Sequence, residues 1–182
     1  NVGSGPHGLE VIGNQLFACS GSRLKVYDLN SGNENLNINL GGSFANGITH
    51  KENDLFITDY NELKIYHYDI DQDNLSVLID NLPFTPNGIF YDDIQNRILV
   101  LSWQANAPIY ELSLSDTSVS IVKETNLGYL DGIAMDNNGD FYVSAWSNNA
   151  IHKFNSNFSG SPTNVLNGMN NPADIFYNRN LN

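Results

Sequence analysis

Residues 130–146 read LDGIAMDNNGDFYVSAW, and this stretch decides the fold. It holds an apolar run anchored on a glycine, then a turn rich in Asn, Asp and Gly, then a second apolar run. Short strand-like runs separated by such turns are typical of antiparallel strands joined as a hairpin. The stretch therefore predicts two neighbouring strands of one sheet.

The glycine-anchored phrase recurs along the chain with a period of roughly forty residues, which is the mark of a repeat protein. Each copy places an aliphatic residue directly after the glycine. A fifth copy carries Asp174 in place of the glycine. The glycines of the other four copies are Gly8, Gly47, Gly88 and Gly132.

Three further strand-like runs follow the anchor within each repeat. The second runs are 16–18, 55–57, 98–100 and 141–143; the third are 24–27, 63–66, 109–112 and 151–154; the fourth are 36–40, 75–78, 119–122 and 163–166. Four strands per repeat without a helix-length amphipathic stretch predict a β-propeller. Ankyrin and tetratricopeptide repeats need helices, and the Gly-His and Trp-Asp dipeptides of WD repeats are absent.

We therefore expect one all-β domain over residues 1–182, a β-propeller with about four four-stranded blades plus the first strand of a fifth. The expected blades are approximately 6–41, 45–81, 86–126 and 130–168, and the next blade starts within 172–182. We expect the chain to be part of a longer propeller, and the alternative is a closed four-bladed ring with a short tail. Open blade edges would favour pairing with another chain, so a homo-oligomer is expected.

The charge of the chain limits its partners. Twenty acidic residues against eight basic ones give a formal net charge of −12. Nucleic-acid binding rests on clustered Lys and Arg, so no nucleic-acid partner is expected. No apolar run has the roughly 20 residues of a membrane span. The acidity fits either cation binding or a soluble surface, and the single cysteine, Cys19, is expected to be a buried, inert thiol.

The residue directly before each anchoring glycine is a candidate for function. In the four repeats it is His7, Asn46, Asn87 and Asp131, and the first strand of each blade would place it near the channel mouth. Oxygen-bearing side chains that converge around an axis suit a hard cation such as calcium. The alternative is that Asn-Gly and Asp-Gly simply form turns.

The repeats resemble the six-bladed propellers of the regucalcin/gluconolactonase family and the related NHL-repeat and strictosidine-synthase-like propellers. The resemblance lies in TPNGIFYD (85–92), in the stretch quoted above and in NNAIHKF (148–154). It implies that the chain is part of a six-bladed ring outside the cytoplasm. It also implies divalent-metal-dependent hydrolysis of lactones or small esters, with calcium or another divalent cation as the cofactor and a small molecule as the substrate.

Members of that family hold the cation with a Glu, an Asn in a Pro-Asn-Gly phrase and an Asp in a Pro-Asp-Gly phrase one blade later. The resemblance thus makes Asn87 a metal ligand, Asp131 a metal ligand and catalytic residue, and Asn46 a substrate-binding residue. Two departures stand out: Leu130 replaces the proline, and Ser4 occupies the nearest counterpart of the Glu.

Other candidates carry weaker patterns. His7 is expected to help Asn46 bind substrate hydroxyl groups. Trp103 and Trp146 end the second strands of neighbouring blades, where they would either flank a ligand or pack between the blades. Asp59, near the same repeat position, is expected to cap a turn. His50, His67 and His152 share no repeat position and are expected to be packed or solvated, and no nucleophile elbow is present.

Three functions compete at this point. The first is a metal-dependent hydrolase of lactones or small esters. The second is a non-catalytic propeller that binds a protein or a small ligand through its loops. The third, an RNA-binding NHL module, conflicts with the acidic composition.

Overall fold

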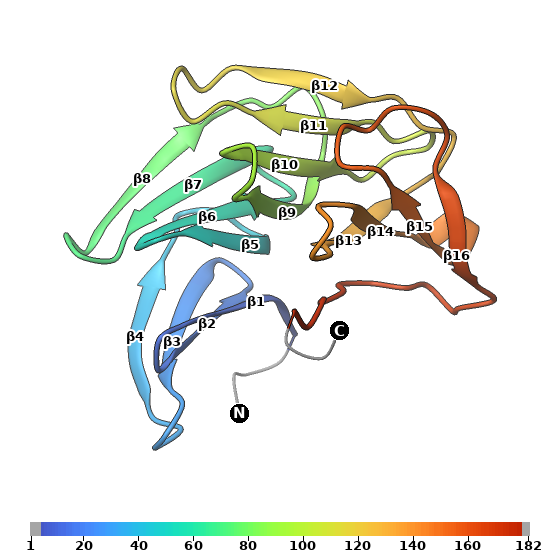
Figure 1. Ribbon diagram of the computed structural model, residues 1–182. Helices are drawn as coiled ribbons and strands as arrows, with labels where there is room; N and C mark the ends of the chain where they lie inside the picture. The colour runs from blue at the N-terminus through green and yellow to red at the C-terminus, as the bar shows by residue number, and fades with distance from the viewer. Residues whose placement is uncertain (1–4, 180–182) are drawn as a thin grey trace. The chain divides into compact units, whose positions relative to one another are not determined.

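The computed structural model describes residues 5–179, and these residues form antiparallel strands joined by short turns (Figure 1). The strands make four sheets of four strands each. The one helical element of the described residues is a single 3₁₀ turn, η1 (Trp146–Asn148). The chain is all-β with the four-stranded blades of a β-propeller, and the predicted fold class is confirmed.

The chain divides into two compact units, and the first ends at Pro86. Each unit contains two blades, and in every blade the strands lie in sequence order from one edge to the other. The blades of the first unit are β1 (Pro6–Ile12), β2 (Gln15–Ser20), β3 (Arg23–Asp28) and β4 (Glu34–Asn39), followed by β5 (Ala45–Lys51), β6 (Asp54–Asp59), β7 (Lys64–Asp69) and β8 (Asn74–Ile79).

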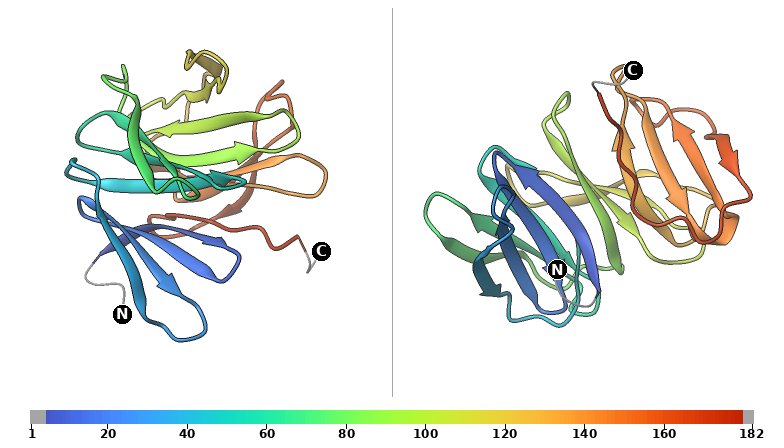
Figure 2. Two further views of the ribbon diagram at one scale, coloured as in Figure 1. Left: turned by 90° about the vertical axis from the view of Figure 1, so that its left-hand side faces the viewer. Right: turned by 90° about the horizontal axis from the view of Figure 1, so that it is seen from below.

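The second unit begins at Asn87 and repeats this arrangement. The right-hand view of Figure 2 shows the four strands of its last blade side by side in orange and red. The blades of the second unit are β9 (Pro86–Asp92), β10 (Arg97–Ser102), β11 (Ile109–Leu112) and β12 (Val119–Lys123), followed by β13 (Leu130–Met135), β14 (Phe141–Ala145), β15 (Ala150–Phe154) and β16 (Thr163–Asn167).

The anchoring phrase lies in a bulge of the first strand. The register between the first two strands shifts between Pro6 and Leu9, between Ala45 and Ile48, and between Leu130 and Ile133. A bulge releases residues from the ladder and re-aims their side chains, and such bulges are frequent next to functional sites. The two residues before the aliphatic position, which include the anchoring glycine, are therefore free of regular pairing.

The glycine itself is required where neighbouring blades of one unit approach each other. A Cβ atom at Gly88 would overlap the carbonyl oxygen of Asp131, and one at Gly8 would overlap the carbonyl oxygen of Asn46. Within each unit, the first strand of the first blade therefore packs backbone against backbone on the first strand of the second blade. Only a residue without a side chain allows that approach.

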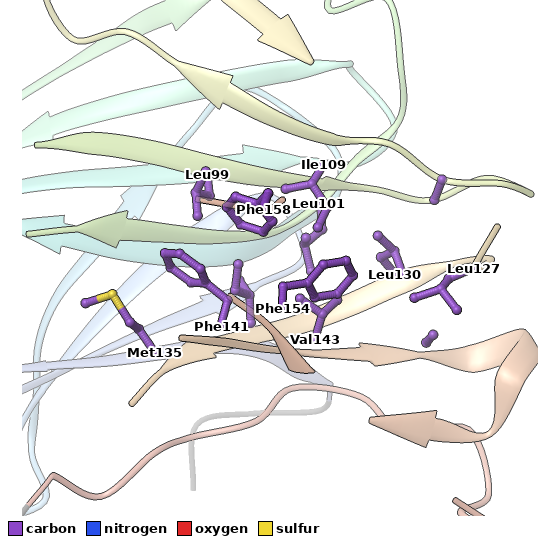
Figure 3. Packing of buried hydrophobic residues seen from close by; sticks show 13 residues of the cluster. Leu99, Leu101, Ile109, Leu127, Leu130, Met135, Phe141, Val143, Phe154 and Phe158 are labelled. Carbon is purple, nitrogen blue, oxygen red and sulfur yellow. The ribbon is translucent and has the colours of Figure 1, made fainter. Parts of the chain in front are cut away.

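Apolar side chains fill the space between the two blades of each unit. In the second unit Leu99 and Leu101 of β10 face Phe141 and Val143 of β14 (Figure 3). Phe158 closes this core, because its ring stacks on that of Phe141 with the centroids 4.9 Å apart. In the first unit the equivalent core joins β2 and β3 to β5, β6 and β7. Burial of these aliphatic and aromatic faces is the main force that holds each pair of blades together.

Residues 172–178 follow the path expected for the start of a fifth blade but form no strand. A Cβ at Gly132 would fall 2.7 Å from the Cα atom of Asp174, and the Ser144 hydroxyl donates to the carbonyl of Ala173 over 2.7 Å. This segment thus lies against β13 as β13 lies against β9 (Figure 2). A strand is defined by its ladder, and no second strand pairs with this segment among the described residues.

Cys19 and Asp59 are both fully buried. Cys19 is fully buried, and burial raises the pKa of its thiol far above the ordinary value, so it is the inert thiol expected. Asp59 is fully buried and accepts N–H groups from Ser43 and Phe44 on one side and from Asn61 and Glu62 on the other. It caps the turn as predicted.

Among residues 5–179 no helix is long and apolar enough to cross a membrane.

Candidate functional site

Asp131 occupies the bulge at the start of β13, and its backbone is fixed there by a hydroxyl group. The N–H of Gly132 donates to Ser144 Oγ over 2.8 Å, in place of a ladder hydrogen bond. Leu130, which precedes Asp131, is fully buried and pairs with Ala145 of β14. The apolar Leu130 anchors the strand, and the bulge turns the following carboxylate out of the sheet.

Asn87 and Asp131 are brought together, as the sequence predicts. Asn87 is 3% exposed, and its Nδ2 donates to the carbonyl of Leu130 over 2.9 Å. The same amide approaches the Asp131 carboxylate and lowers the pKa of that group by hydrogen bonding. The side chain from the first strand of one blade therefore holds the backbone and the carboxylate of the next.

The Asp131 carboxylate is largely buried, and burial disfavours its negative charge. Burial raises its pKa from 3.8 to about 6, although the nearby Trp146 N–H opposes the rise. The negative charge of Asp174 raises the pKa further, and the amide of Asn87 lowers it. No Lys or Arg of the described residues forms an ion pair with Asp131. A desolvated carboxylate without a cationic partner beside a second carboxylate is a local excess of negative charge.

Aromatic rings from two blades meet beside this carboxylate. Trp103, directly after β10, lies 4.9 Å from Trp146 between ring centroids in an edge-to-face contact. Trp103 also lies 5.3 Å from Tyr129, which precedes β13. The backbone N–H of Trp146 donates to the carbonyl of Tyr129 over 3.1 Å, so Trp146 and Asp131 flank the Leu130–Ala145 strand pair. Trp103 and Trp146 thus pack on each other between the two blades, and the ligand-binding role of both residues stays a prediction.

His7 and Asn46, the other predicted substrate-binding residues, belong to the first unit. The ring of His7, on β1, lies 4.4 Å from that of Phe44, and Phe44 contacts Tyr60 edge-on at 5.6 Å. Asn46 lies in the bulge of β5, and its carbonyl oxygen is the group that faces Gly8. In the first unit, His7 therefore packs in a cluster of aromatic rings, and Asn46 lies against Gly8, the residue that follows His7. The substrate-binding roles of His7 and Asn46 stay predictions.

The donor atoms fit a hard cation only in part. Asp131 supplies a carboxylate and Asn87 an amide, which are oxygen donors of the kind that calcium takes. Asp174 adds a second carboxylate close enough to affect the Asp131 charge. No group of three or more His, Cys, Asp or Glu side chains in residues 5–179 is disposed around a metal position. Ser4, the nearest counterpart of the family's Glu, lies outside the described residues.

The remaining histidines lie apart from this site. His50 pairs with Glu10 at 3.5 Å, and His67 pairs with Asp54. His152 is buried in β15, and burial lowers its pKa. They are packed or paired side chains, as the absence of a shared repeat position predicts.

Two residues of the neighbourhood were missed by the sequence reasoning. Asp174 stands at the glycine position of the fifth phrase and affects the charge of Asp131. Tyr129 lies three positions before an anchoring glycine, where Phe44 stands in the second repeat. An aromatic residue at the same repeat position in two repeats is a signal that could have identified Tyr129.

Comparison with known proteins places the chain among propellers. No protein-family model and no curated protein matches the sequence. Among solved structures, a chain of a nidogen/laminin complex superposes with a TM-score of 0.83 at 18% identity, over 95% of this chain and 68% of the other. A protein assigned as a gluconolactonase superposes with a TM-score of 0.71 at 12% identity, over 88% of this chain and 62% of the other.

The extracellular domain of a protein assigned as a one-component system from B. thetaiotaomicron is also similar. Its TM-score is 0.72 at 13% identity, over 96% of this chain and 25% of the other. This chain therefore spans less than two thirds of the gluconolactonase-like structure and a quarter of the one-component-system domain. At these low identities the similarity shows the propeller fold alone. One of the structures that share this fold is a protein assigned as a gluconolactonase.

Proposed function

We propose that this chain belongs to a divalent-cation-dependent hydrolase of lactones or small esters. The observation that carries the proposal is the Asp131 carboxylate, which is largely buried, has no Lys or Arg ion-pair partner in the described residues and lies beside the amide of Asn87. Likeness in fold to a protein assigned as a gluconolactonase supports the proposal. Asn87 and Asp131 are the residues that would hold the cation, through their side-chain oxygens.

Asp131 suits the role of general base. In the cation-free protein its pKa of about 6 leaves the carboxylate ionised at neutral pH, and therefore able to hold a cation or to accept a proton. Asp131 accepts a proton from a water molecule whose oxygen forms a bond to the carbonyl carbon of the lactone. The C–O bond of the ring then breaks, and the departing oxygen takes the proton from Asp131, which gives a hydroxy acid. When bound, the cation supplies polarisation of the carbonyl and a lower pKa of the attacking water.

A position outside the cytoplasm is part of this proposal. It is supported by the similarity in fold to an extracellular domain from B. thetaiotaomicron. The partner proposed is a small molecule, in keeping with the acidic composition, which disfavours nucleic acid.

A second candidate is a propeller that binds another protein without catalysis. The observation that favours it is the likeness to a structure solved as a nidogen/laminin complex, with a TM-score of 0.83. A protein-binding propeller has no need of a desolvated carboxylate. Lactone hydrolysis that depends on both the cation and Asp131 therefore separates the two candidates.

The test is a calcium titration of the 182-residue chain, followed by thermal unfolding and by lactone hydrolysis. A cation that binds only the folded state adds about 2.7 kcal/mol of stability at a concentration one hundred times its Kd. We expect calcium to raise the melting temperature of the wild type and to leave Asp131→Asn unchanged. Asp116→Asn is the matched control, because Asp116 is an exposed aspartate in a turn.

Hydrolysis of δ-valerolactone should require calcium, stop with EDTA and disappear in Asp131→Asn. The proposal fails if millimolar calcium, magnesium or manganese leaves the unfolding of the wild type unchanged. It also fails if Asp131→Asn hydrolyses the lactone as fast as the wild type does.

A further inference from the structure

Four asparagines of this chain are followed directly by a glycine, which is the dipeptide most prone to lose the side-chain amide without an enzyme. The main-chain nitrogen of the glycine attacks the side-chain carbonyl carbon of the asparagine, because a glycine has no side chain that blocks the approach. The sequence makes the four dipeptides equivalent, so a difference in their reactivity has to come from the fold. The four residues are Asn46, Asn87, Asn138 and Asn167.

In two of these dipeptides the attacking N–H group is held in a hydrogen bond. The Gly47 N–H donates to the hydroxyl of Thr58 over 2.8 Å, and the Gly139 N–H donates to the carbonyl of Asp136 over 3.0 Å. Each bond holds the proton that the nitrogen has to lose and fixes the direction of the nitrogen. The reaction therefore proceeds only from a minor state in which the bond has opened, and the fold protects both asparagines.

Asn87 is protected at its side chain. It is 3% exposed, and its Nδ2 donates to the carbonyl of Leu130 over 2.9 Å. This nitrogen is the leaving group of the reaction, and the amide has to break its hydrogen bond before it turns toward the next main-chain nitrogen. Burial also keeps the amide away from the hydroxide and the water that the reaction consumes, so Asn87 reacts only when the structure opens locally.

Asn167 lacks these restraints. It is the last residue of β16, the edge strand of its blade, and all five residues of this strand are exposed. The Gly168 N–H donates to no acceptor in residues 5–179, and a Cβ built on Gly168 would have open space around it. The Asn167 amide has a long hydrogen bond, of 3.5 Å, to the exposed Asn164. Both reacting groups therefore lie in solvent.

We propose that Asn167 is a deamidation site, and that the fold directs the reaction to this residue among the four dipeptides. The Gly168 nitrogen loses its proton to hydroxide and forms a bond to Cγ of Asn167, while Nδ2 takes a proton from water and leaves as ammonia. The product is a five-membered succinimide ring. Water then opens the ring at either carbonyl carbon and leaves aspartate or isoaspartate. The reaction is independent of the proposed hydrolase function.

The modification changes the main chain as well as the charge. Isoaspartate adds one carbon atom to the main chain between two contacts, the Ala150–Asn167 ladder pair and the hydrogen bond from the Met169 N–H to the Asn149 carbonyl over 3.0 Å. These contacts hold the end of β16 on its neighbour, and an inserted atom disturbs their common register. An exposed isoaspartate is also the kind of residue that an isoaspartyl methyltransferase esterifies, with S-adenosylmethionine as the methyl donor.

The test is incubation of the 182-residue chain at pH 8 and 37 °C, followed by trypsin digestion and mass spectrometry. The eight Lys and Arg residues place each Asn-Gly dipeptide in a different peptide, namely 26–51, 65–97, 124–153 and 154–179. We expect peptide 154–179 to lose its amide about tenfold faster than the other three, because each of those has a hydrogen bond that must open first. Fragmentation should assign the change to Asn167, and a methyltransferase with labelled S-adenosylmethionine should label the same peptide.

Two variants and one condition act as controls. Asn167→Gln should abolish the rapid phase, because the longer side chain closes a six-membered ring far more slowly. Asn164→Gln is the matched control and should leave the rate unchanged, because Asn164 is exposed on the same strand but is followed by a valine. In guanidinium chloride, which unfolds the chain, the four peptides should lose their amides at similar rates.

The proposal is wrong if peptide 154–179 of the folded chain reacts no faster than the other three, or if the modified residue is not Asn167. It is also wrong if peptide 154–179 keeps its full advantage in guanidinium chloride, because the local sequence and not the fold would then set the rates.

Discussion

Replacing Asp131 by Asn should stabilise the protein, and more so at alkaline pH. Because burial raises the pKa of Asp131 from 3.8 to about 6, the folded state prefers the protonated carboxyl group. The carboxyl group costs nothing well below pH 3.8, where it is protonated in both the unfolded and the folded state. The cost appears as the pH rises through the window between 3.8 and about 6, and it is complete above this window.

The size of the effect follows from the shift. A shift of about two pKa units corresponds to about 3 kcal/mol above pH 7, and about half of this cost is present at pH 5. Asp131→Asn keeps the shape of the side chain without the charge. Its free energy of unfolding should therefore exceed that of the wild type by about 3 kcal/mol at pH 8 and by about 1.5 kcal/mol at pH 5.

The assay is urea unfolding followed by far-UV circular dichroism at both pH values, with EDTA present so that no bound cation offsets the charge. Asp116→Asn serves as the control of opposite sign. Hydrogen bonds from Ser118 and Ser113 lower the pKa of Asp116, so its replacement should not stabilise the protein at pH 8. A gain for Asp131→Asn that is equal at pH 5 and pH 8, or no gain at all, would refute the reasoning.

Three further predictions follow from single contacts. Tryptophan emission of the wild type should titrate with a midpoint near pH 6, and this step should vanish in Asp131→Asn because the carboxylate lies beside the Trp146 indole; its persistence would assign the titration to another group. Gly88→Ala should lose several kcal/mol in urea unfolding, since its Cβ would overlap backbone of the next blade, and a loss below about 1 kcal/mol would show that the blades can move apart. Val11, half exposed on β1, should contribute to self-association, so Val11→Lys should shift sedimentation toward the monomer; an unchanged profile would remove this face from any oligomer.

The repeat and its local chemistry were determined by the sequence alone. Period-two runs such as 24–27 and 151–154 lie in strands, because alternate side chains of a strand face opposite sides of a sheet. Gly88 and Gly132 identified the places of closest backbone approach, since any larger residue would collide there. The pairing of Asn87 with Asp131 was also predictable, because equal repeat positions of adjacent blades lie side by side.

The burial and the charge of the Asn87–Asp131 pair were decided by the tertiary structure. No sequence pattern shows that the Asp131 carboxylate is desolvated and lacks a Lys or Arg ion-pair partner in the described residues, because burial and charge compensation depend on residues from several strands and from the segment at Asp174. The sequence offered packing or ligand contact for Trp146 without deciding between them. Only the folded arrangement packs its ring edge-to-face on the ring of Trp103, since this contact is set by the approach of two blades and not by the order of residues along either of them.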